Sequence, residues 1–493
     1  MSSDEIFNRA CQAEASAQPE LAVQLYQEAL RINPADADAA TNLGLVSMSL
    51  GRVDAAEMAH RIAQGLQPHR RRTEAQRLLD GGRIFGELAP PSSDLASAAH
   101  VLRELLRESG YNPTSAHAAF GASRGAAGGP PTASEFFRKR LQIDAPPASG
   151  LQALHHLFLF GLALDHSIAA SALGEKNLQH LLEHGLLLHS DGSKLVAPFQ
   201  VYPLALAWPP EHSSECALIA TDWDLESLLP PRTTIMPVGV DSLELALTAP
   251  RGKRRRVLDL CAGSGVQGIA AALTGAEEVI AADVSPRALR FCAFNAALND
   301  VAARIHPVAS DVYSNIDGAF DAILCNPPFV AVPAAVRARC EDWALFADGG
   351  DDGAVVLRAV VAGAAARLAP GGWLMIVTEV PNIKGAHRWL LDEDASGALR
   401  LRVVYNPRHV QSADEYAADR ARERVAADAD AWAAALRATG VATMASAMLI
   451  AARGEGGGKT VPHSADVDGS EERSVLVDGL PTLRAALSEL IPS

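Results

Sequence analysis

Between residues 257 and 451 the sequence alternates short apolar, β-branched runs with segments whose apolar residues have helical spacing. Seven such runs follow one another: RVLDLC, EVIAAD, RIHPVAS, FDAILC, WLMIVTEV, LRVVY and ASAMLIAAR. Strands that alternate with helices form parallel sheets, because each helical crossover brings the next strand back in the same direction. This alternation therefore predicts a doubly wound α/β sheet of seven strands.

The charge balance narrows the class of partner. The chain has 43 basic and 58 acidic residues, which gives a formal net charge of −15. A net-acidic protein is a poor electrostatic partner for phosphate backbones and for anionic membranes. Nucleic acid is therefore the less expected partner, and no membrane partner is expected. Six cysteines without a CxxC spacing, and an acidic N-terminus without an apolar segment, favour a reduced, cytoplasmic protein.

Residues 1–87 are expected to form helical repeats. A period of 34 residues relates two sets of positions: Ala22, Tyr26, Ala29 and Pro34 are followed by Ala56, His60, Ala63 and Pro68. The pattern resembles the tetratricopeptide repeat, a helix–turn–helix unit in which small residues allow close packing. Two uses stay open, a helical cap on the next domain or a module that binds a peptide, a protein partner or a second copy.

Residues 94–215 are expected to form a helical, winged-helix-like domain on the substrate side. The most apolar stretch, residues 151–170, includes three histidines and an aspartate, so we expect a long buried helix there and no membrane span. Two more helices and a Ser-Asp-Gly turn between short strands follow. His180 and His184 lie four residues apart without a third ligand, so no metal site is expected. The helix that carries them has no basic face, which argues against DNA binding.

The segment VLDLCAGSGVQGIAAA, residues 257–272, has the pattern of a strand, a glycine-rich turn and the start of a helix. Gly263 and Gly265 allow backbone torsions and a close ligand approach that a Cβ atom would block. This spacing by itself also fits a dinucleotide. Asp259, inside the strand, favours instead a ligand with a cationic centre, such as a sulfonium nucleoside with an amino-acid tail.

Three more polar residues follow the next runs in order. Asp283 ends the second run, where a carboxylate can accept hydrogen bonds from both ribose hydroxyls. Asp311 follows the third run, where we expect it to accept a hydrogen bond from an adenine amino group, and Asn326 closes the fourth run. Open α/β sheets bind ligands at the carboxyl ends of their strands. We therefore expect these residues and Asp259 to face one crevice.

Asn326 begins the tetrad Asn326-Pro327-Pro328-Phe329, which ends a strand because consecutive prolines cannot continue a sheet ladder. Residues 257–380 resemble class I S-adenosylmethionine-dependent methyltransferases, and the tetrad resembles the (N/D)PP(Y/F) signature of those that methylate planar nitrogens. A looser resemblance, from about residue 94 to 453, is to relatives of the release-factor glutamine methyltransferases. These resemblances imply a Rossmann-like methyltransferase domain over residues 216–453, with S-adenosylmethionine as cofactor.

The tetrad also suggests how a planar nitrogen is methylated. The lone pair of an amide or aniline-type nitrogen is delocalised, which makes that nitrogen a poor nucleophile. We expect the Asn326 side-chain oxygen and the Pro327 carbonyl to accept its two N–H groups, with Phe329 stacked on the flat substrate group. The rigid prolines fix the two acceptors in place. No metal is needed, because the methyl donor is already activated.

The resemblance and the residue types also lead to expectations about three further segments and two cysteines. The resemblance implies that residues 346–361, FADGGDDGAVVLRAVV, lie near the substrate channel, where their aspartates would repel nucleic acid; a capped helix start is the alternative. It also implies that Val238–Ser242 cover the cofactor. Cys261 and Cys325 are expected to be small packing residues. Residues 454–493 are expected to be a mostly disordered tail with a short helix at 480–490.

The sequence is compatible with four functions. The leading one is methylation of a glutamine amide in a protein. The second is methylation of an amino group of an RNA base: phenylalanine in place of tyrosine in the tetrad departs from the usual glutamine enzymes and also occurs in RNA enzymes, and the basic run RGKRRR, residues 251–256, offers an RNA contact. The third is methylation of a small amine or peptide in specialised metabolism. The fourth is a non-catalytic cofactor-binding scaffold, which the intact Asn326 and glycine turn disfavour.

Overall fold

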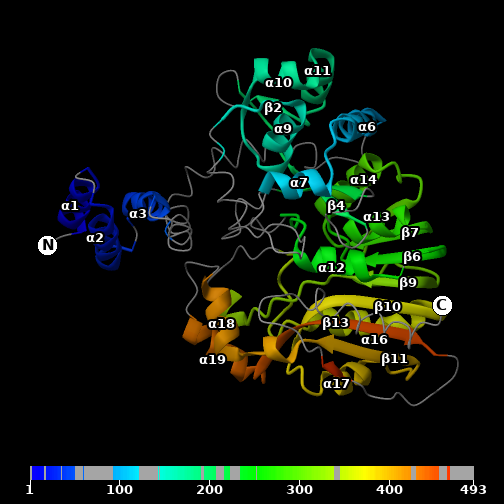
Figure 1. Ribbon diagram of the computed structural model, residues 1–493. Helices are drawn as coiled ribbons and strands as arrows, with labels where there is room; N and C mark the ends of the chain where they lie inside the picture. The colour runs from blue at the N-terminus through cyan, green and yellow to red at the C-terminus, as the bar shows by residue number, and fades with distance from the viewer. Residues whose placement is uncertain are drawn as a thin grey trace.

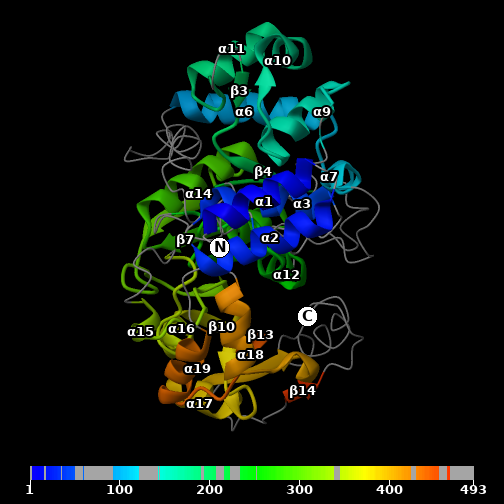
Figure 2. The ribbon, with the colours of Figure 1, turned by 90° about the vertical axis from the view of Figure 1, so that its left-hand side faces the viewer.

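The computed structural model is shown in Figure 1. It describes residues 3–15, 18–34, 36–49, 59, 93–120, 143, 145–189, 194–206, 216–222, 234–250, 252–337, 345–422, 429–454 and 464–466. Among these residues no helix is long and apolar enough to cross a membrane. Two views place α10 and α11 at one end of the molecule and α17 and α19 at the other (Figure 1 and Figure 2).

All seven predicted runs form strands of one sheet: β6 (Arg254–Leu260), β7 (Ala276–Asp283), β8 (Ile305–Ala309), β9 (Phe320–Cys325), β10 (Leu368–Pro381), β11 (Leu399–Tyr405) and β13 (Thr443–Arg453). The order across the sheet is β14-β11-β13-β10-β9-β6-β7-β8. Strands β8, β7, β6, β9 and β10 are parallel (Figure 1). The carboxyl ends of β6, β7, β8 and β9 therefore lie at one edge, as predicted.

The sheet differs from the prediction in two ways. Within the described ranges it has nine strands instead of seven, because β12 (Gln411–Ser412) pairs with β13 and β14 (Ser464–Asp466) pairs with β11. Both added strands are too short to leave a periodic pattern in the sequence. In addition, β13 runs antiparallel to β10 and β11, so the sheet is mixed. Strand β14 lies in the tail expected to be mostly disordered, and the helix expected at 480–490 lies outside the described residues.

The central strands are continuously apolar because helices bury both faces of the sheet. Successive residues alternate between two cores, so that Val257 packs into one core and Leu258 into the other. The first face is covered by α12 (Val240–Thr248), α13 (Val266–Leu273) and α14 (Pro286–Leu298), and the second by α16 (Val355–Arg367) and α17 (Ala386–Glu393). The remaining helices of this region are α15 (Ala334–Arg337), η4 (Pro407–His409), α18 (Ala413–Arg422) and α19 (Ala429–Ala438).

The preceding region contains the predicted helices and hairpin. Its elements are α6 (Ser93–Glu108), α7 (Pro113–Phe120), α9 (Gly150–Leu154), η2 (His155–Leu159), β1 (Leu164–Asp165), α10 (His166–Leu173), α11 (Glu175–Glu183), β2 (Leu188–His189) and β3 (Lys194–Val196). Strand β3 pairs with both β1 and β2. The likeness to a winged helix stays a prediction. The long helix expected from residue 151 ends at Leu159 after a π-helical turn, and Gly161 with φ of 62° turns the chain away.

A two-stranded sheet joins this region to the large sheet. Strands β4 (Gln200–Ala205) and β5 (Cys216–Thr221) pair antiparallel on either side of the domain boundary predicted at 215/216. One apolar core continues from α6 and α7 through both strands to α13 and α14. Burial across this boundary therefore ties residues 94–215 to the large sheet.

Two asparagines of α14 complete the backbone hydrogen bonding of β5. The Asn295 amide accepts from Ala220 N–H at 2.8 Å and donates to Ala220 O at 2.8 Å. Asn299 makes the same pair of bonds with Leu218, at 2.8 and 2.7 Å. Asn295 Nδ2 also donates to Ser264 O at 2.9 Å, inside the glycine turn. These buried amides satisfy backbone groups that no neighbouring strand reaches.

The N-terminal helices α1 (Ser3–Ala15), α2 (Pro19–Ile32) and α3 (Ala37–Ser49) have an apolar core of their own. The repeat positions Ala22, Tyr26 and Ala29 are fully buried in it. The second half of the predicted repeat lies outside the described residues, apart from Ala59, which is buried. The similarity to tetratricopeptide repeats stays a prediction.

We expect Asn295→Ala to lower the free energy of unfolding by about 2–4 kcal/mol, because it leaves the Ala220 backbone groups and Ser264 O buried without partners. Urea unfolding followed by circular dichroism measures the change. The matched control is Asn177→Ala, which removes one hydrogen bond from α11 to Leu173 O at the end of α10 and should cost less than about 1 kcal/mol. Equal losses in the two variants would contradict the bridging role of Asn295.

Candidate functional site

The glycine turn between β6 and α13 contains three residues with positive φ: Cys261 (55°), Gly263 (52°) and Gly265 (79°). A Cβ atom on Gly265 would lie 2.6 Å from Cys292 Sγ, so only glycine fits there. A Cβ atom on Gly263 would meet nothing within 4 Å, so its backbone borders open space that a ligand can approach. Both glycines occupy the predicted turn, and their contact with a cofactor stays a prediction.

Asp259 lies beneath this turn with only 1% of its surface exposed. Its Oδ2 accepts a hydrogen bond from Gly268 N–H at 2.8 Å, in the first turn of α13. Burial raises the pKa of Asp259 to about 8, a rise that the neighbouring Asp283 increases and the Gly268 hydrogen bond reduces. The sequence did not indicate this structural bond to α13. A cationic ligand nearby would favour the ionised carboxylate.

Asp283 ends β7 and faces the glycine turn. Its Oδ2 accepts from Gly263 N–H and its Oδ1 from Ser285 N–H, each at 2.8 Å. A carboxylate has about four lone-pair positions, so each oxygen can still accept a ribose hydroxyl. Burial raises the pKa of Asp283, and the two backbone hydrogen bonds work against that rise. Asp311 lies two residues after β8 in an exposed turn, where its backbone N–H donates to Ser314 Oγ.

Asn326 follows β9 at the same edge. Its Nδ2 donates to Asp241 Oδ2 at 2.9 Å and lies 3.5 Å from Ser242 Oγ. Its Oδ1 is buried and has no hydrogen-bond partner among the described residues. An amide oriented in this way keeps one acceptor for a ligand N–H group. The resemblance implied that Val238–Ser242 cover the cofactor, but nothing in the sequence predicted the contact between Asp241 and Asn326.

The chain that follows the tetrad is paired with a second segment by backbone hydrogen bonds. Val330 N–H donates to Ala347 O, and Gly349 N–H donates to Val330 O, both at 2.9 Å. A Cβ atom on Gly349 would lie 2.8 Å from the Phe329 Cα atom, so the two segments are in direct contact. Pro327 is buried, and Phe329, a half-buried residue, packs against the neighbouring apolar cluster. The segment 346–361 therefore lies beside the tetrad, and its place near a substrate channel stays a prediction.

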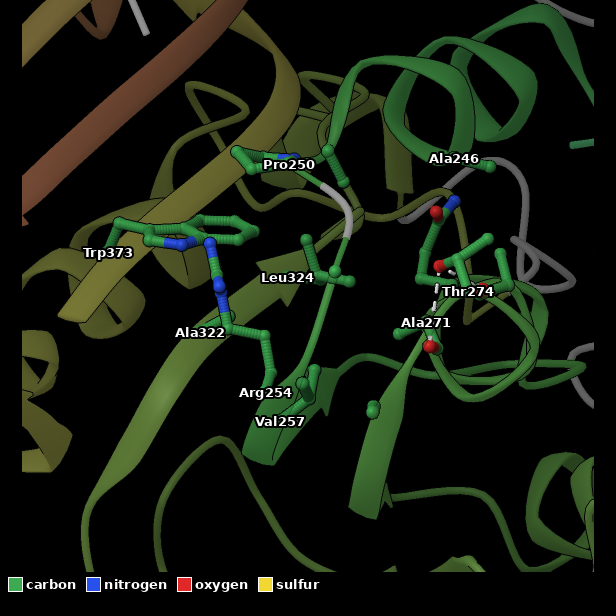
Figure 3. Close-up of a pocket in the computed structure, with 14 residues that line it drawn as sticks. Ala246, Pro250, Arg254, Val257, Ala271, Thr274, Ala322, Leu324 and Trp373 are labelled. Carbon is green, nitrogen blue, oxygen red and sulfur yellow. Dashed lines mark hydrogen bonds between the residues drawn. The ribbon is translucent and has the colours of Figure 1, made fainter. Parts of the chain in front are cut away.

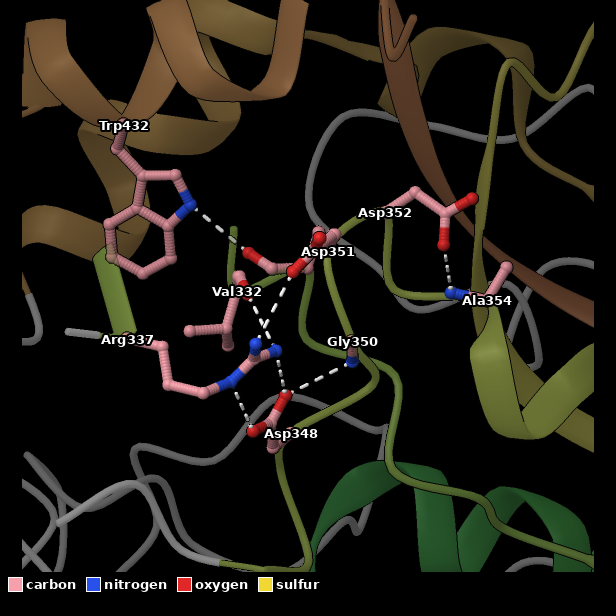
Figure 4. Close-up of polar contacts among 9 residues, drawn as sticks. Val332, Arg337, Asp348, Gly350, Asp351, Asp352, Ala354 and Trp432 are labelled. Atoms are coloured by element: carbon pink, nitrogen blue, oxygen red, sulfur yellow. Dashed lines mark hydrogen bonds and ion pairs between the residues drawn. The ribbon is translucent and has the colours of Figure 1, made fainter. Parts of the chain in front are cut away.

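Two aromatic residues from the distant helices α18 and α19 hold the chain at Ala331, just after the tetrad. The Tyr416 hydroxyl accepts from Ala331 N–H at 3.1 Å, and Trp432 Nε1–H donates to Ala331 O at 3.0 Å. Figure 4 shows the Trp432 contact beside the acidic loop, the part of segment 346–361 that contains Asp348, Asp351 and Asp352. Sequence reasoning missed both residues, because they lie 85 and 101 positions away and no motif marks them.

The aspartates of the acidic loop are paired with arginines, and Figure 4 shows the pairs that Arg337 makes with Asp348 and Asp351. Arg337 donates to both oxygens of Asp348 at 2.8 and 2.9 Å and contacts Asp351 at 3.3 Å. Asp352 pairs with Arg358 at 2.5 Å. Burial alone would raise the pKa of Asp352, but the bonds from Arg358 and from backbone N–H groups lower it. The expected repulsion of nucleic acid by this loop is therefore weakened, because the sequence did not show that arginines compensate the charge.

A separate pocket lies between α12, α13 and the sheet (Figure 3). Its lining includes Arg254 and Ala276, the first residues of β6 and β7, together with Trp373 on β10. Figure 3 shows the Arg254 side chain extending toward the Trp373 ring. None of the predicted site residues is among the described residues that line this pocket. It is distinct from the edge that carries Asn326.

The expected cysteine roles agree with the structure. Cys325 is fully buried beside Cys261, and burial raises the pKa of the Cys325 thiol well above its usual value. A buried neutral thiol is a packing group and a poor nucleophile. No cluster of three or more metal-ligating side chains occurs in the part of the chain that the structure describes. The rings of His180 and His184 lie 4.4 Å apart between centroids and are tilted by 40°.

Residues 239–341 match the family model described as the methyltransferase small domain. The chain is 39% identical over 150 residues to the release factor glutamine methyltransferase of Deinococcus radiodurans, covering 28% of this chain and 51% of that protein. It is 38% identical over 141 residues to that of Cereibacter sphaeroides, covering 27% and 49%. It is 32% identical over 99 residues to the tRNA1(Val) (adenine(37)-N6)-methyltransferase of a Shewanella strain, covering 19% and 42%. The chain thus spans about half the length of these relatives.

Among solved structures, the Thermus thermophilus 16S rRNA N2 G1207 methyltransferase in complex with AdoMet and guanosine aligns over 49% of this chain and 60% of its own. The sequence identity is 22% and the TM-score is 0.29. The family match includes every predicted site residue, from Asp259 to Phe329. The match of residues 239–341, together with the helix-covered parallel strands around them, supports a Rossmann-like α/β methyltransferase domain with S-adenosylmethionine as cofactor.

The arrangement fits this cofactor in three respects. The open side of Gly263 leaves room for a ligand against the turn, and the Asp283 carboxylate keeps acceptor positions for ribose hydroxyls. The buried Asp259 carboxyl would gain from a nearby cationic group.

We expect Asp283→Ala to weaken S-adenosylmethionine binding by about 10- to 100-fold, because two hydrogen bonds to a charged acceptor are lost. Isothermal titration calorimetry measures the affinity, and circular dichroism checks the fold. Asp317→Ala, a change at an exposed aspartate of a nearby turn, serves as the control and should bind normally. An unchanged affinity in Asp283→Ala would exclude the ribose role.

The raised pKa of Asp259 also predicts a pH dependence of stability. An unfolded aspartate loses its proton near pH 4, whereas the folded carboxyl keeps it up to about pH 8. Between these values the folded state binds the extra proton, so this group lowers the free energy of unfolding as pH rises, by at most about 1.4 kcal/mol per pH unit. Asp259→Asn retains an acceptor for Gly268 N–H but does not titrate.

The advantage of Asp259→Asn over the wild type in urea unfolding, without cofactor, should therefore grow from pH 4 to pH 8. Asp317→Asn provides the matched comparison and should show no such trend. A stability difference for Asp259→Asn that stays constant over this range would contradict the assigned pKa.

Proposed function

We propose that this chain is an S-adenosylmethionine-dependent N-methyltransferase whose acceptor is a planar amide nitrogen, the side chain of a protein glutamine. Two relatives named release factor glutamine methyltransferase support this choice of acceptor. The tetrad Asn326-Pro327-Pro328-Phe329 supports a planar nitrogen, because the resemblance associates it with that class of acceptor. Protein as the substrate class also agrees with the net charge of −15.

One observation carries the proposal. Asn326 Oδ1 is a buried amide oxygen that no donor in the described part of the chain reaches, at the strand edge that also carries Gly263 and Asp283. A buried acceptor left unpaired costs free energy, commonly about 1–3 kcal/mol, so its presence calls for a ligand donor. An NH2 group supplies such a donor and leaves a second N–H for the adjacent Pro327 carbonyl.

The chain's own residues would act by positioning. The cofactor, when bound, supplies an electrophilic methyl group on a sulfonium sulfur. Asn326 Oδ1 and the Pro327 carbonyl would each accept one N–H of the substrate amide, which directs the nitrogen lone pair away from both acceptors. The Phe329 ring would stack on the flat amide. The methylated nitrogen would then release its surplus proton to water, so this scheme needs no strong protein base.

Methylation of an RNA base receives less support from the geometry. The basic run at residues 251–256 enters β6 at its amino end, whereas Asn326 lies at the carboxyl edge. Arg256 is also engaged within the domain: its Nε donates to Glu278 at 2.7 Å, and its guanidinium lies 4.7 Å from the Phe320 ring centroid. This arginine therefore links strands β6, β7 and β9 to one another.

The N-terminal helices α1, α2 and α3 are proposed to hold a protein partner or the substrate protein. They form a core of their own, so they can act as a separate recognition module. Leu21 and Ile32 on α2 are exposed at 40% and 45%, which provides apolar surface for a contact. A helical cap remains the second possible use.

We expect Asn326→Ala to lower methyl transfer by about 10²- to 10³-fold with little change in cofactor affinity, because the acceptor is lost while the Gly263 and Asp283 contacts remain. The assay follows label from deuterated S-adenosylmethionine into a Gly-Gly-Gln peptide, and calorimetry measures cofactor binding. Asn177→Ala is the control and should keep full activity. Loss of cofactor binding in Asn326→Ala would contradict the assigned role.

The acceptor class is tested separately by incubating cell extract with purified protein and deuterated S-adenosylmethionine. Mass spectrometry should find the label on glutamine in protein. Label on an adenine or guanine amino group, or only on small amines, would overturn the glutamine proposal. An RNA acceptor would also show binding that tightens strongly as salt is lowered.

A further inference from the structure

We infer that Asp241 is a positioning residue that fixes which end of the Asn326 amide faces the substrate. The inference rests on the proposed function for its substrate, an NH2 group that needs an acceptor. Asp241 Oδ2 accepts from Asn326 Nδ2 at 2.9 Å, and the opposite end of the amide, Oδ1, is buried and meets no donor from the residues that the structure describes. The proposed chemistry requires this orientation.

The orientation depends on a carboxylate at residue 241. The two ends of an amide have similar shapes, so its hydrogen-bond partners decide which end faces a given group. Asp241 Oδ1 accepts from Ser242 N–H at 2.8 Å, which leaves Oδ2 for Asn326. An ionised carboxylate can only accept, so it selects the NH2 end of Asn326 and turns the oxygen toward the site.

The surrounding backbone holds Asp241 in this position. Ser242 O accepts from Gln267 Nε2 at 2.9 Å, which ties the first turn of α12 to α13 and hence to the glycine turn. Ser242 and Gln267 are both buried. A Cβ atom on Gly239 would lie 2.5 Å from Asp241 Oδ1, so the glycine leaves the space that the carboxylate occupies. Asp241 is thus held against both the acceptor segment and the cofactor turn.

The variant Asp241→Asn reverses the selection almost without a change in shape. The side-chain oxygen of residue 241 would stay on Ser242 N–H, so its new NH2 group would face Asn326. Two NH2 groups cannot bond to each other, so the Asn326 amide would turn and present Nδ2 to the substrate. A donor would then face a donor, and the substrate NH2 group would lose its acceptor.

The double variant Asp241→Asn/Asn326→Asp exchanges the two side chains and restores the pattern. The NH2 group of residue 241 would donate to one oxygen of residue 326, leaving the other oxygen as an acceptor. Aspartate at this position also fits the (N/D)PP(Y/F) signature. The single variant Asn326→Asp places two carboxylates in contact and should be impaired by their repulsion.

The kinetic test uses deuterated S-adenosylmethionine and a Gly-Gly-Gln peptide. Asp241→Asn and Asn326→Asp should each lower kcat by about 100-fold with cofactor affinity unchanged, and the double variant should recover at least about 10-fold. Gly239→Ala, which displaces the carboxylate without altering its charge, should also lower kcat. Asp317→Asn is the matched control. Failure of the double variant to exceed both single variants would overturn the inference.

A second readout does not depend on the acceptor. In ¹⁵N-labelled protein the Asn326 side-chain NH2 signals, identified by their loss in Asn326→Asp, should shift in Asp241→Asn and stay unchanged in Asp317→Asn. Unshifted signals in Asp241→Asn would overturn the inference even if no acceptor is methylated. Full peptide methylation by Asn326→Ala would instead refute the proposed function. Normal kcat in Asp241→Asn, with Asn326→Ala inactive, would refute only the role of Asp241.

Discussion

The parallel alignment of β6, β7, β8 and β9 is the constraint on which the rest of the structure depends. Parallel strands direct all their carboxyl ends to one edge, and helices on both faces keep the strands buried. Four segments far apart in the sequence therefore leave the sheet side by side. The glycine turn, Asp283, Asp311 and Asn326 share an edge for this reason, and the site needs no additional device to bring them together.

Side-chain amides and carboxylates then fix the backbone around that edge. Asp259 bonds to the start of α13, Asp283 bonds to Gly263, and Asn295 links the glycine turn to β5. These groups are buried or half-buried, where an unsatisfied polar atom is costly, so their geometry is restricted. Strand β5 pairs with β4 of the region over residues 94–215, which joins that region to the glycine turn through Asn295. A change in the position of β5 would therefore be transmitted to the glycine turn through Asn295.

The acceptor side of the site is supported by residues from the C-terminal part of the chain. Tyr416 and Trp432 bond both backbone groups of Ala331, and arginines neutralise the aspartates of the facing loop. The aspartates of the loop thus form ion pairs within the protein, and these ion pairs fix the loop next to Phe329. Rigid support of this kind favours positioning as the main contribution of the protein to the reaction.

The sequence alone determined the seven long strands, the polar residues that follow four of them, and the glycine turn. Strands buried on both faces need continuous apolar residues, and backbone with positive φ favours glycine, so residue types indicate both features. It could not determine the direction of β13, the short strands β12 and β14, or the break after Leu159, since these depend on pairing and local turns. The contacts of Asp241 with Asn326, of Asn295 with β5, and of Arg337 with Asp348 were decided only by the tertiary structure. A hydrogen bond joins residues by distance in space, and one sequence contains no record of which distant side chains meet.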